Sequence, residues 1–173
     1  MSSRDAAREV APRKAPPRFS LPAARWAQAA LAGLGGFVTI LALAMAEAGV
    51  GTLLLIAPFG ASCVLVFALP QSPLAQPRNV IGGHLISTAM GLCVLHLLGA
   101  TPLGFALGVG LAIAAMSLTG TLHPPAGADP IVVMMVAAPW SFLIFPVLTG
   151  ALTIVLMGIG FHRFVAGKPY PTP

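Results

Sequence analysis

The fold is decided by residues 119–128, Thr-Gly-Thr-Leu-His-Pro-Pro-Ala-Gly-Ala, which lie between two long apolar runs. His123 is polar, and Pro124 and Pro125 have no backbone N–H, so one helix must end before them and another can begin at them. An interrupted helix at membrane depth is tolerated only where protein or a water-filled cavity surrounds it. We therefore expect this segment to line a functional cavity.

The composition indicates an integral membrane protein built as one all-α, polytopic helix bundle. Of the 173 residues, 57% are hydrophobic and only 8% are charged, and the mean hydropathy is +0.93. The net charge of +5 is concentrated ahead of the first apolar run, in Arg4, Arg8, Arg13, Lys14, Arg18 and Arg25. This asymmetry predicts a cytoplasmic N-terminus by the positive-inside rule. A nucleic-acid partner would need basic residues clustered on a folded module, and the sequence offers no such cluster.

We expect three regions along the chain. Residues 1–24 form a basic, disordered cytoplasmic tail, residues 25–165 the transmembrane domain, and residues 166–173 a C-terminal tail. The tripeptide Ala44-Met45-Ala46 resembles a signal-peptide cleavage site. However, a long tail precedes the apolar segment 26–46, and this segment is nearly long enough to span a membrane, which favours a retained helix.

Six apolar segments follow one another, at residues 26–46, 51–69, 79–98, 102–119, 124–138 and 140–162. The first, third and sixth can cross a hydrocarbon core of ~30 Å, whereas the fifth is short. Six spans place both termini, Arg78 and His123 on the cytoplasmic side and Glu47 outside. The alternative has four full spans with 51–69 and 124–138 re-entrant, and it leaves Arg78 outside. The charge bias favours six.

An internal repeat appears when the chain is shifted by 67 residues. Residues 58–61, Pro-Phe-Gly-Ala, then fall on 125–128, Pro-Ala-Gly-Ala, and eleven positions are identical over residues 52–92. Each copy holds three segments, 26–98 and 102–162. Because the number of segments is odd, the second copy is inverted relative to the first, as in many secondary transporters. The prediction is an inverted 3+3 repeat.

The two Pro-Gly stretches are candidate substrate-binding sites. Free N–H groups at a helix N-terminus attract anions, and small residues let a ligand approach the backbone. The predicted lining residues are Pro58, Gly60, Ala61 and Ser62 in the first copy and His123, Pro124, Pro125, Ala126, Gly127 and Ala128 in the second. The alternative is that each stretch ends one helix and packs against a neighbour.

A few polar residues within the apolar segments are further candidates, because ionisable groups inside a membrane are usually functional. His123 and His84 can donate hydrogen bonds and couple protons. Arg78 can attract an anion or snorkel to headgroups, and Asn79 can cap the third segment. Asp129 is a third coupling candidate that could pair with Arg78 or His123. The other histidines, at segment ends, are explained by residence at the membrane interface.

Other chemistries have little support in the sequence. The serines, Ser62 among them, show no His–carboxylate partners, which argues against an enzyme, and neither a metal-ligand pattern nor a cofactor fingerprint is present. Cys63 and Cys93 are expected to be small buried hydrophobic residues. The patterns Gly104/Gly108 and Gly83/Ser87/Gly91 predict close helix packing, within the bundle or in a homo-oligomer.

Three motifs in order give the chain a family resemblance. Residues 57–62 (APFGAS), 72–84 (SPLAQPRNVIGGH) and 122–128 (LHPPAGA) closely resemble the HPP family of integral membrane proteins, over about residues 25–165. Plastid and cyanobacterial members are associated with nitrite transport, so the resemblance implies four transmembrane helices and transport of a small anion. It also implies importance for His123, Pro124, Pro125, Gly127, Arg78, Asn79, Gly83 and His84. The chain departs from the family pattern at Asp129-Pro130, which favours proton coupling or a different anion.

These observations together predict a transporter or channel for a small inorganic anion, such as nitrite, in a bacterial inner membrane. The termini are expected in the cytoplasm, and the partners are the anion and the lipid bilayer. The alternative is a membrane scaffold or sensor subunit that carries no flux. An intramembrane enzyme is a third reading, disfavoured by the lack of paired catalytic groups.

Overall fold

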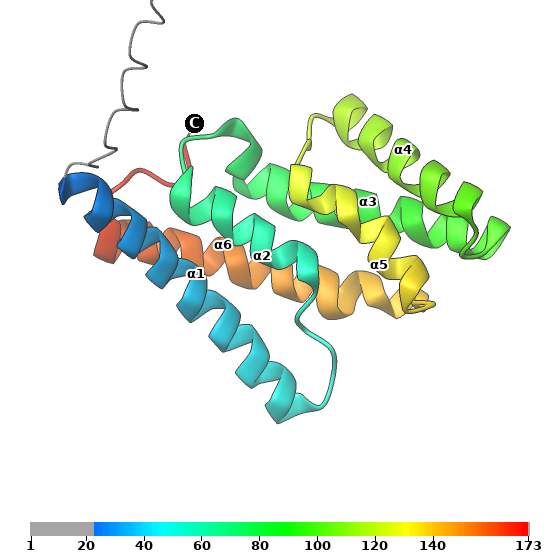
Figure 1. Ribbon diagram of the computed structural model, residues 1–173, viewed down its shortest axis with the longest axis horizontal. Helices are drawn as coiled ribbons and strands as arrows, with labels where there is room; N and C mark the ends of the chain where they lie inside the picture. Colours follow the sequence, from blue (N-terminus) through cyan, green and yellow to red (C-terminus); the bar gives the residue numbers. More distant parts are fainter. Residues whose placement is uncertain (1–22, 173) are drawn as a thin grey trace, which may run out of the picture.

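The computed structural model describes residues 23–172, and every element of regular secondary structure in this part of the chain is a helix. The expected N-terminal tail lies outside the described residues except for its last two. Four helices are long and apolar enough to cross a membrane: α1 (Ala23–Val50), α3 (Pro77–Leu98), α4 (Pro102–Thr119) and the stretch Trp140–Ala166. The last consists of η4 (Trp140–Leu143), η5 (Ile144–Leu148), α6 (Thr149–Phe161) and η6 (His162–Ala166). Figure 1 shows α3 and α6 side by side, with α1 and α4 on opposite sides of the bundle.

Two short helical segments lie between the long helices. The first is α2 (Ala57–Cys63) with η1 (Val64–Ala68), and the second is η3 (Pro124–Ala128) with α5 (Asp129–Met135). At 1.5 Å per residue each covers about 18 Å, well short of the ~30 Å hydrocarbon core. Both occupy stretches that the sequence marked as marginal or short, and α2 packs against η3. The structure therefore has four long helices and two short segments, and six full-length helical spans are not present among the described residues.

Prolines and glycines set the helix boundaries as their backbone chemistry requires. Proline occupies the first turn of α2, α3 and α4, where its missing N–H costs nothing. The turn before α4 is closed by Thr101, whose side chain accepts the N–H of Gly104, and α4 ends at Gly120 in the left-handed conformation. The prediction that Asn79 caps α3 is wrong: the cap is Gln76, and Asn79 donates instead to the carbonyl of Leu122.

The described basic residues gather at one end of the bundle. Arg25 and Lys168 line the same surface cavity, and Arg163 lies in the last turn of η6. Arg78 lies at the same end, since the chain just after Lys168 packs on the loop before α3: Tyr170 donates to the carbonyl of Ala75 at 3.0 Å. The opposite end carries Glu47 and the ring stack of His96 on Trp140. This separation of charge is the one the sequence predicts.

Glycines let the short segments approach the long helices closely. A Cβ on Gly91 of α3 would lie 2.7 Å from the Cα of Pro130 in α5, and one on Gly158 of α6 would lie 2.5 Å from Val66 in η1. The small-residue patterns are therefore packing surfaces inside the bundle, as predicted. Large apolar side chains cover the outside, among them Phe37, Leu103, Leu118, Leu156 and Phe164. An apolar exterior of this extent fits a protein surrounded by lipid.

Candidate functional site

Four polar side chains meet at the junction of α2, α3, η3 and α5. Ser62, His84, His123 and Asp129 are each 0% exposed. A continuous row of hydrogen bonds joins them: Asp129 Oδ2 lies 2.7 Å from His84 Nδ1, His84 Nε2 lies 2.8 Å from Ser62 Oγ, and Ser62 Oγ lies 2.8 Å from His123 Nε2. We call these four residues the polar cluster. Ionised groups so deep in a membrane bundle are stable only when paired, and they mark functional positions.

The row of hydrogen bonds has two different ends. At one end His123 Nδ1 lies 2.8 Å from the carbonyl oxygen of Leu74, in the loop before α3. At the other end Thr88 donates to Asp129 Oδ2 over a long 3.4 Å, while Asp129 Oδ1 is buried without a protein partner. One end therefore touches a loop near the surface, and the other holds an oxygen with an unused acceptor site.

Local sequence explains how each member of the polar cluster is positioned. Gly83 lies beside His84, and a Cβ on Gly83 would be 2.6 Å from the Cβ of His123 and 2.9 Å from the carbonyl oxygen of Thr121. Only a glycine there lets the extended residues before Pro124 lie against α3. Ser87 holds η3 in place by donating to the carbonyl of Ala126.

The structure brings together some of the predicted site residues and separates others. Ser62, His84 and His123 meet in the polar cluster, and Asp129, predicted only as a coupling residue, joins them. Buried residues around the cluster include Pro58, Gly83, Pro125 and Ala126, with Gly127 half-buried. Away from it lie Arg78, which is exposed and donates to the carbonyl of Thr119, and Asn79, together with the exposed Gly60, Ala61, Pro124 and Ala128.

Two expectations about individual polar residues are wrong. Ser62 does have a His–carboxylate pair beside it: His84, 22 positions away in sequence, contacts Ser62, and Asp129, 45 positions beyond His84, contacts His84. Asp129 pairs with His84 rather than with Arg78 or His123. His162 is fully buried and lies 2.8 Å from the carbonyl of Val66, so its ring faces the interior of the bundle.

One of the backbone donors expected to bind an anion is used within its own turn: the N–H of Ala126 donates to the carbonyl of His123 at 3.0 Å. In the first Pro-Gly stretch the N–H of Phe59, next to Pro58, likewise donates to the carbonyl of Ile56 at 3.0 Å. These two N–H groups are therefore not free to bind an anion in this conformation.

Sequence reasoning missed Ser87, Thr88 and the C-terminal segment. Ser87 and Thr88 follow His84 at the third and fourth positions, which places all three on one face of α3. That spacing was the available signal. The sequence carried no signal for the contact between Tyr170 and the carbonyl of Ala75, because no pattern around a tyrosine near the chain end indicates which residue it will contact.

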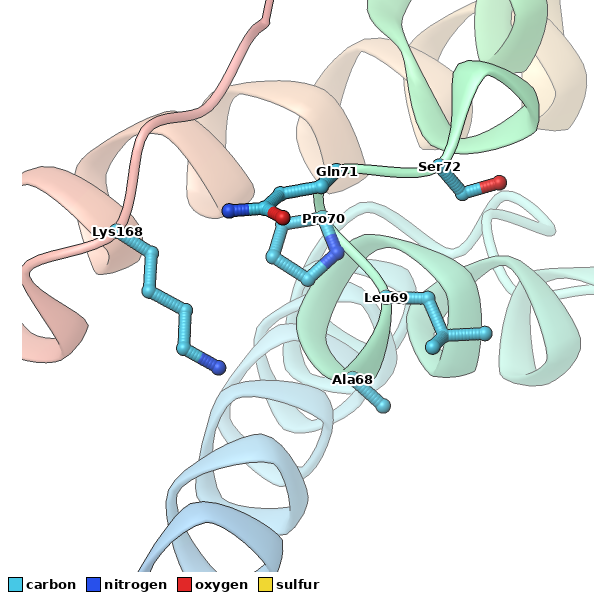
Figure 2. A pocket seen from close by; sticks show the side chains of 6 residues that line it. All are labelled: Ala68, Leu69, Pro70, Gln71, Ser72 and Lys168. Carbon is cyan, nitrogen blue, oxygen red and sulfur yellow. The ribbon is translucent and has the colours of Figure 1, made fainter.

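A surface cavity of about 470 Å³ opens beside the loop that ends at the polar cluster. Figure 2 shows its lining, Ala68 to Ser72 from the end of η1 and the following loop, with the Lys168 side chain on the other side. The same loop continues to Leu74, whose carbonyl contacts His123. The cavity and the polar cluster thus contact neighbouring parts of one short loop.

Comparison with known proteins identifies the family. The chain matches the family model for the HPP transmembrane region over residues 21–171. It is similar to two transmembrane proteins of Dictyostelium discoideum. One is 35% identical over 170 residues, which cover 91% of this chain and 53% of the relative. The other is 41% identical over 125 residues, which cover 68% of this chain and 44% of the relative. The chain thus spans about half the length of these relatives, and no solved structure matches it. This integral membrane protein belongs to the HPP transmembrane family.

Proposed function

We propose that this protein is a transporter or channel for a small inorganic anion, such as nitrite, in a bacterial inner membrane. The observation that carries the proposal is the polar cluster: two histidines and an aspartate, fully buried and hydrogen-bonded where two short helical segments meet. A bundle that needed only to be stable would fill this place with apolar side chains, which pack as well without the desolvation cost. Buried ionisable groups in membrane bundles mark substrate and proton pathways.

The charge arrangement is compatible with an anion despite the carboxylate. Asp129 lies 2.7 Å from His84, so a proton on His84 would compensate its charge inside the protein. His123 faces away from Asp129, toward Leu74 and the loop, and it is the member of the polar cluster available to a negatively charged ligand. The substrate-binding residues of this proposal are therefore His123 and the residues around it. Ser62, His84 and Asp129 lie farther along the row of hydrogen bonds, away from the loop.

We assign the route to the loop that separates the polar cluster from the surface cavity. The cavity lies at the basic end of the bundle, with Lys168 on its rim and Arg25 in the adjoining cavity. Positive groups at the mouth raise the local concentration of anions. Since the polar cluster has no exposed atom surface, the conformation described is the closed one, and the loop from Leu69 to Gln76 is the segment whose movement would admit the anion.

The proposal includes the inverted 3+3 architecture and cytoplasmic termini. Its support is that residues separated by 67 positions make equivalent contacts: Gly91 and Gly158 each meet the short segment of the other half of the chain. Placing the basic end in the cytoplasm satisfies the positive-inside rule. An inverted pair of halves around a central site is the arrangement that supports alternating access.

A flux assay in liposomes tests the function. We expect purified protein to carry nitrite, or another of nitrate, formate and chloride, and the variant His123→Ala to lose at least about tenfold of that flux because the anion-facing ring is gone. The matched control is His96→Ala, since His96 is exposed on α3 and bonds only the carbonyl of Leu92. Absence of flux for every anion, with correctly folded protein, would contradict the proposal and favour a scaffold or sensor subunit.

A second candidate function rests on the order Ser62–His84–Asp129, which is that of a hydrolase triad. The geometry works against it, because Ser62 Oγ is enclosed by His84, His123 and the carbonyl of Pro58, which leaves no room for an acyl group. Labelling of Ser62 by a fluorophosphonate probe would favour a hydrolase, and unlabelled protein that carries anions favours transport.

A further inference from the structure

We infer that the polar cluster holds one exchangeable proton, which crosses the hydroxyl of Ser62 between His84 and His123, and that one proton accompanies each transported anion. The first part stands on the geometry of the polar cluster. The second part rests on the proposed function.

Counting hydrogen-bond donors shows that the polar cluster is one proton short when both histidines are neutral. The carbonyl of Leu74 only accepts, so His123 Nδ1 must carry a hydrogen, and Nε2 of a neutral His123 is then an acceptor. An ionised Asp129 likewise requires a hydrogen on His84 Nδ1, which makes His84 Nε2 an acceptor too.

Ser62 then has one hydrogen for three acceptors. Its hydroxyl oxygen lies 2.8 Å from each of the two Nε2 atoms and 3.2 Å from the carbonyl oxygen of Pro58. With both rings neutral, at least one Nε2 faces the serine oxygen lone pair to lone pair, in a site closed to water. One additional proton on either ring removes the conflict, because that ring donates to Ser62 and Ser62 donates to the other ring.

Charge balance requires the same additional proton. With both histidines neutral, the polar cluster would carry the uncompensated charge of Asp129 in the middle of an apolar bundle, which is costly. One added proton makes the polar cluster neutral as a whole, whether it resides on a ring or on the carboxyl group. A second added proton would leave a net positive charge and would put a donor on both Nε2 atoms.

Among residues 23–172, no other ionisable group near the polar cluster can supply this compensation. The sequences of α4 and α6 contain no acidic, basic or histidine side chain. In α1 the charged residues are Arg25 and Glu47, which lie near its two ends. On α2 the ionisable group is the Cys63 thiol, which has no hydrogen bond to the polar cluster, and α5 contributes Asp129 itself. The proton must therefore be shared among Asp129, His84 and His123.

The transfer across Ser62 is balanced in atoms and charge. His84 Nε2 gives its proton to Ser62 Oγ while the hydroxyl proton of Ser62 passes to His123 Nε2, so Ser62 ends as a neutral hydroxyl. The positive charge has moved from beside Asp129 to His123, next to the loop. There it attracts an anion. After the anion and this proton leave together, uptake of another proton returns the polar cluster to its starting charge.

Reversal potentials in liposomes test the coupling. If one proton moves with each nitrite ion in the same direction, no net charge crosses the membrane and the membrane potential has no effect. A pH difference of one unit should then balance a tenfold nitrite gradient, because each gradient corresponds to about 1.4 kcal/mol. Nitrite carried without any effect of pH would overturn the inference and leave the proposed function intact. Absence of flux for all anions overturns both.

Substitutions at Ser62 test the relay itself. We expect Ser62→Ala to lower proton-driven nitrite accumulation at least about tenfold, and Ser62→Thr to restore most of it, because threonine keeps the hydroxyl. The matched control is Ser117→Ala, since Ser117 is exposed and bonds only the carbonyl of Ile113 in its own helix. Accumulation by Ser62→Ala equal to that of the control would overturn the relay.

Spectroscopy tests the proton without any transport. Nitrogen NMR of histidine-labelled protein should show three ring N–H protons on His84 and His123 together, or two with a protonated carboxyl group on Asp129 seen in the infrared. Two neutral rings beside an ionised Asp129 would overturn the inference even if Ser62→Ala fails to fold.

Discussion

The inward face of α3 and the corresponding face of α6 have the same packing and opposite chemistry. A shift of 67 residues places Gly83 on Gly150 and Gly91 on Gly158, and in all four a Cβ would lie less than 3.0 Å from a neighbour. Between these glycines α3 carries the buried polar residues His84, Ser87 and Thr88, and α6 carries the buried apolar residues Ala151, Ile154 and Val155. Figure 1 shows the two helices side by side through the centre of the bundle.

This comparison separates what builds the bundle from what acts in it. Close approach of a short segment to a long helix needs only small residues, and both helices supply them. The apolar inward face of α6 shows that a central helix of this bundle can pack without buried polar groups. The polar face of α3 is therefore retained at a cost in desolvation, which points to function.

The largest expected effect comes from removing the carboxylate of Asp129, which contacts the polar face of α3. Asp129→Ala leaves His84 without its partner in a fully buried site, and breaking such a pair costs about 3–5 kcal/mol. We expect a lower unfolding midpoint in detergent and no proton-coupled flux. Asp129→Asn, which keeps the shape, should recover much of the stability and none of the coupling. A stable, fully coupled Asp129→Ala protein would show that the polar face has no functional role.

An intermediate effect is expected from filling the paired glycines. Gly91→Ala and Gly158→Ala both overpack the bundle, at about 1–3 kcal/mol each. Gly91 touches Pro130, next to Asp129, whereas Gly158 touches Val66 and Tyr170. Measured at equal folded fraction, flux should fall with Gly91→Ala and persist with Gly158→Ala. Equal loss in both variants would mean that the two faces contribute alike.

The smallest effect is expected from exchanging one hydroxyl between the faces. Thr88→Val removes a long hydrogen bond to Asp129, and Val155→Thr adds a hydroxyl that can bond the carbonyl of Ala151 in its own helix. Each change should alter stability by about 1 kcal/mol or less. Only Thr88→Val should alter the pH dependence of flux, measured across a pH series in liposomes. A shift with Val155→Thr instead would place the titrating group elsewhere.

Much of the architecture was predictable because it depends on local backbone chemistry. Pro124 and Pro125 end a helical pattern wherever they occur, and apolar length alone identifies the long helices. The HPP resemblance drawn from three motifs is confirmed. The prediction of six spans is not confirmed. Segment length marked 51–69 as marginal and 124–138 as short, but only the structure shows that they form short helices at 57–68 and 124–135.

The candidate site was predictable only in part. His84, His123 and Ser62 were named as separate candidates, because buried polar residues stand out in an apolar sequence. Their meeting with Asp129, and the exclusion of Arg78 from the polar cluster, depend on contacts between residues far apart in the chain. Periodicity carries no information on which faces of two distant segments will touch.

The sequence by itself determined that the chain is a membrane bundle with a broken segment at His123, because hydropathy and proline geometry act on neighbouring residues. The tertiary structure alone decided that Ser62, His84, His123 and Asp129 form one hydrogen-bonded row. Packing of α2 and η3 against α3 brings these side chains within hydrogen-bond distance, and that distance is what allows a single proton to be shared among them.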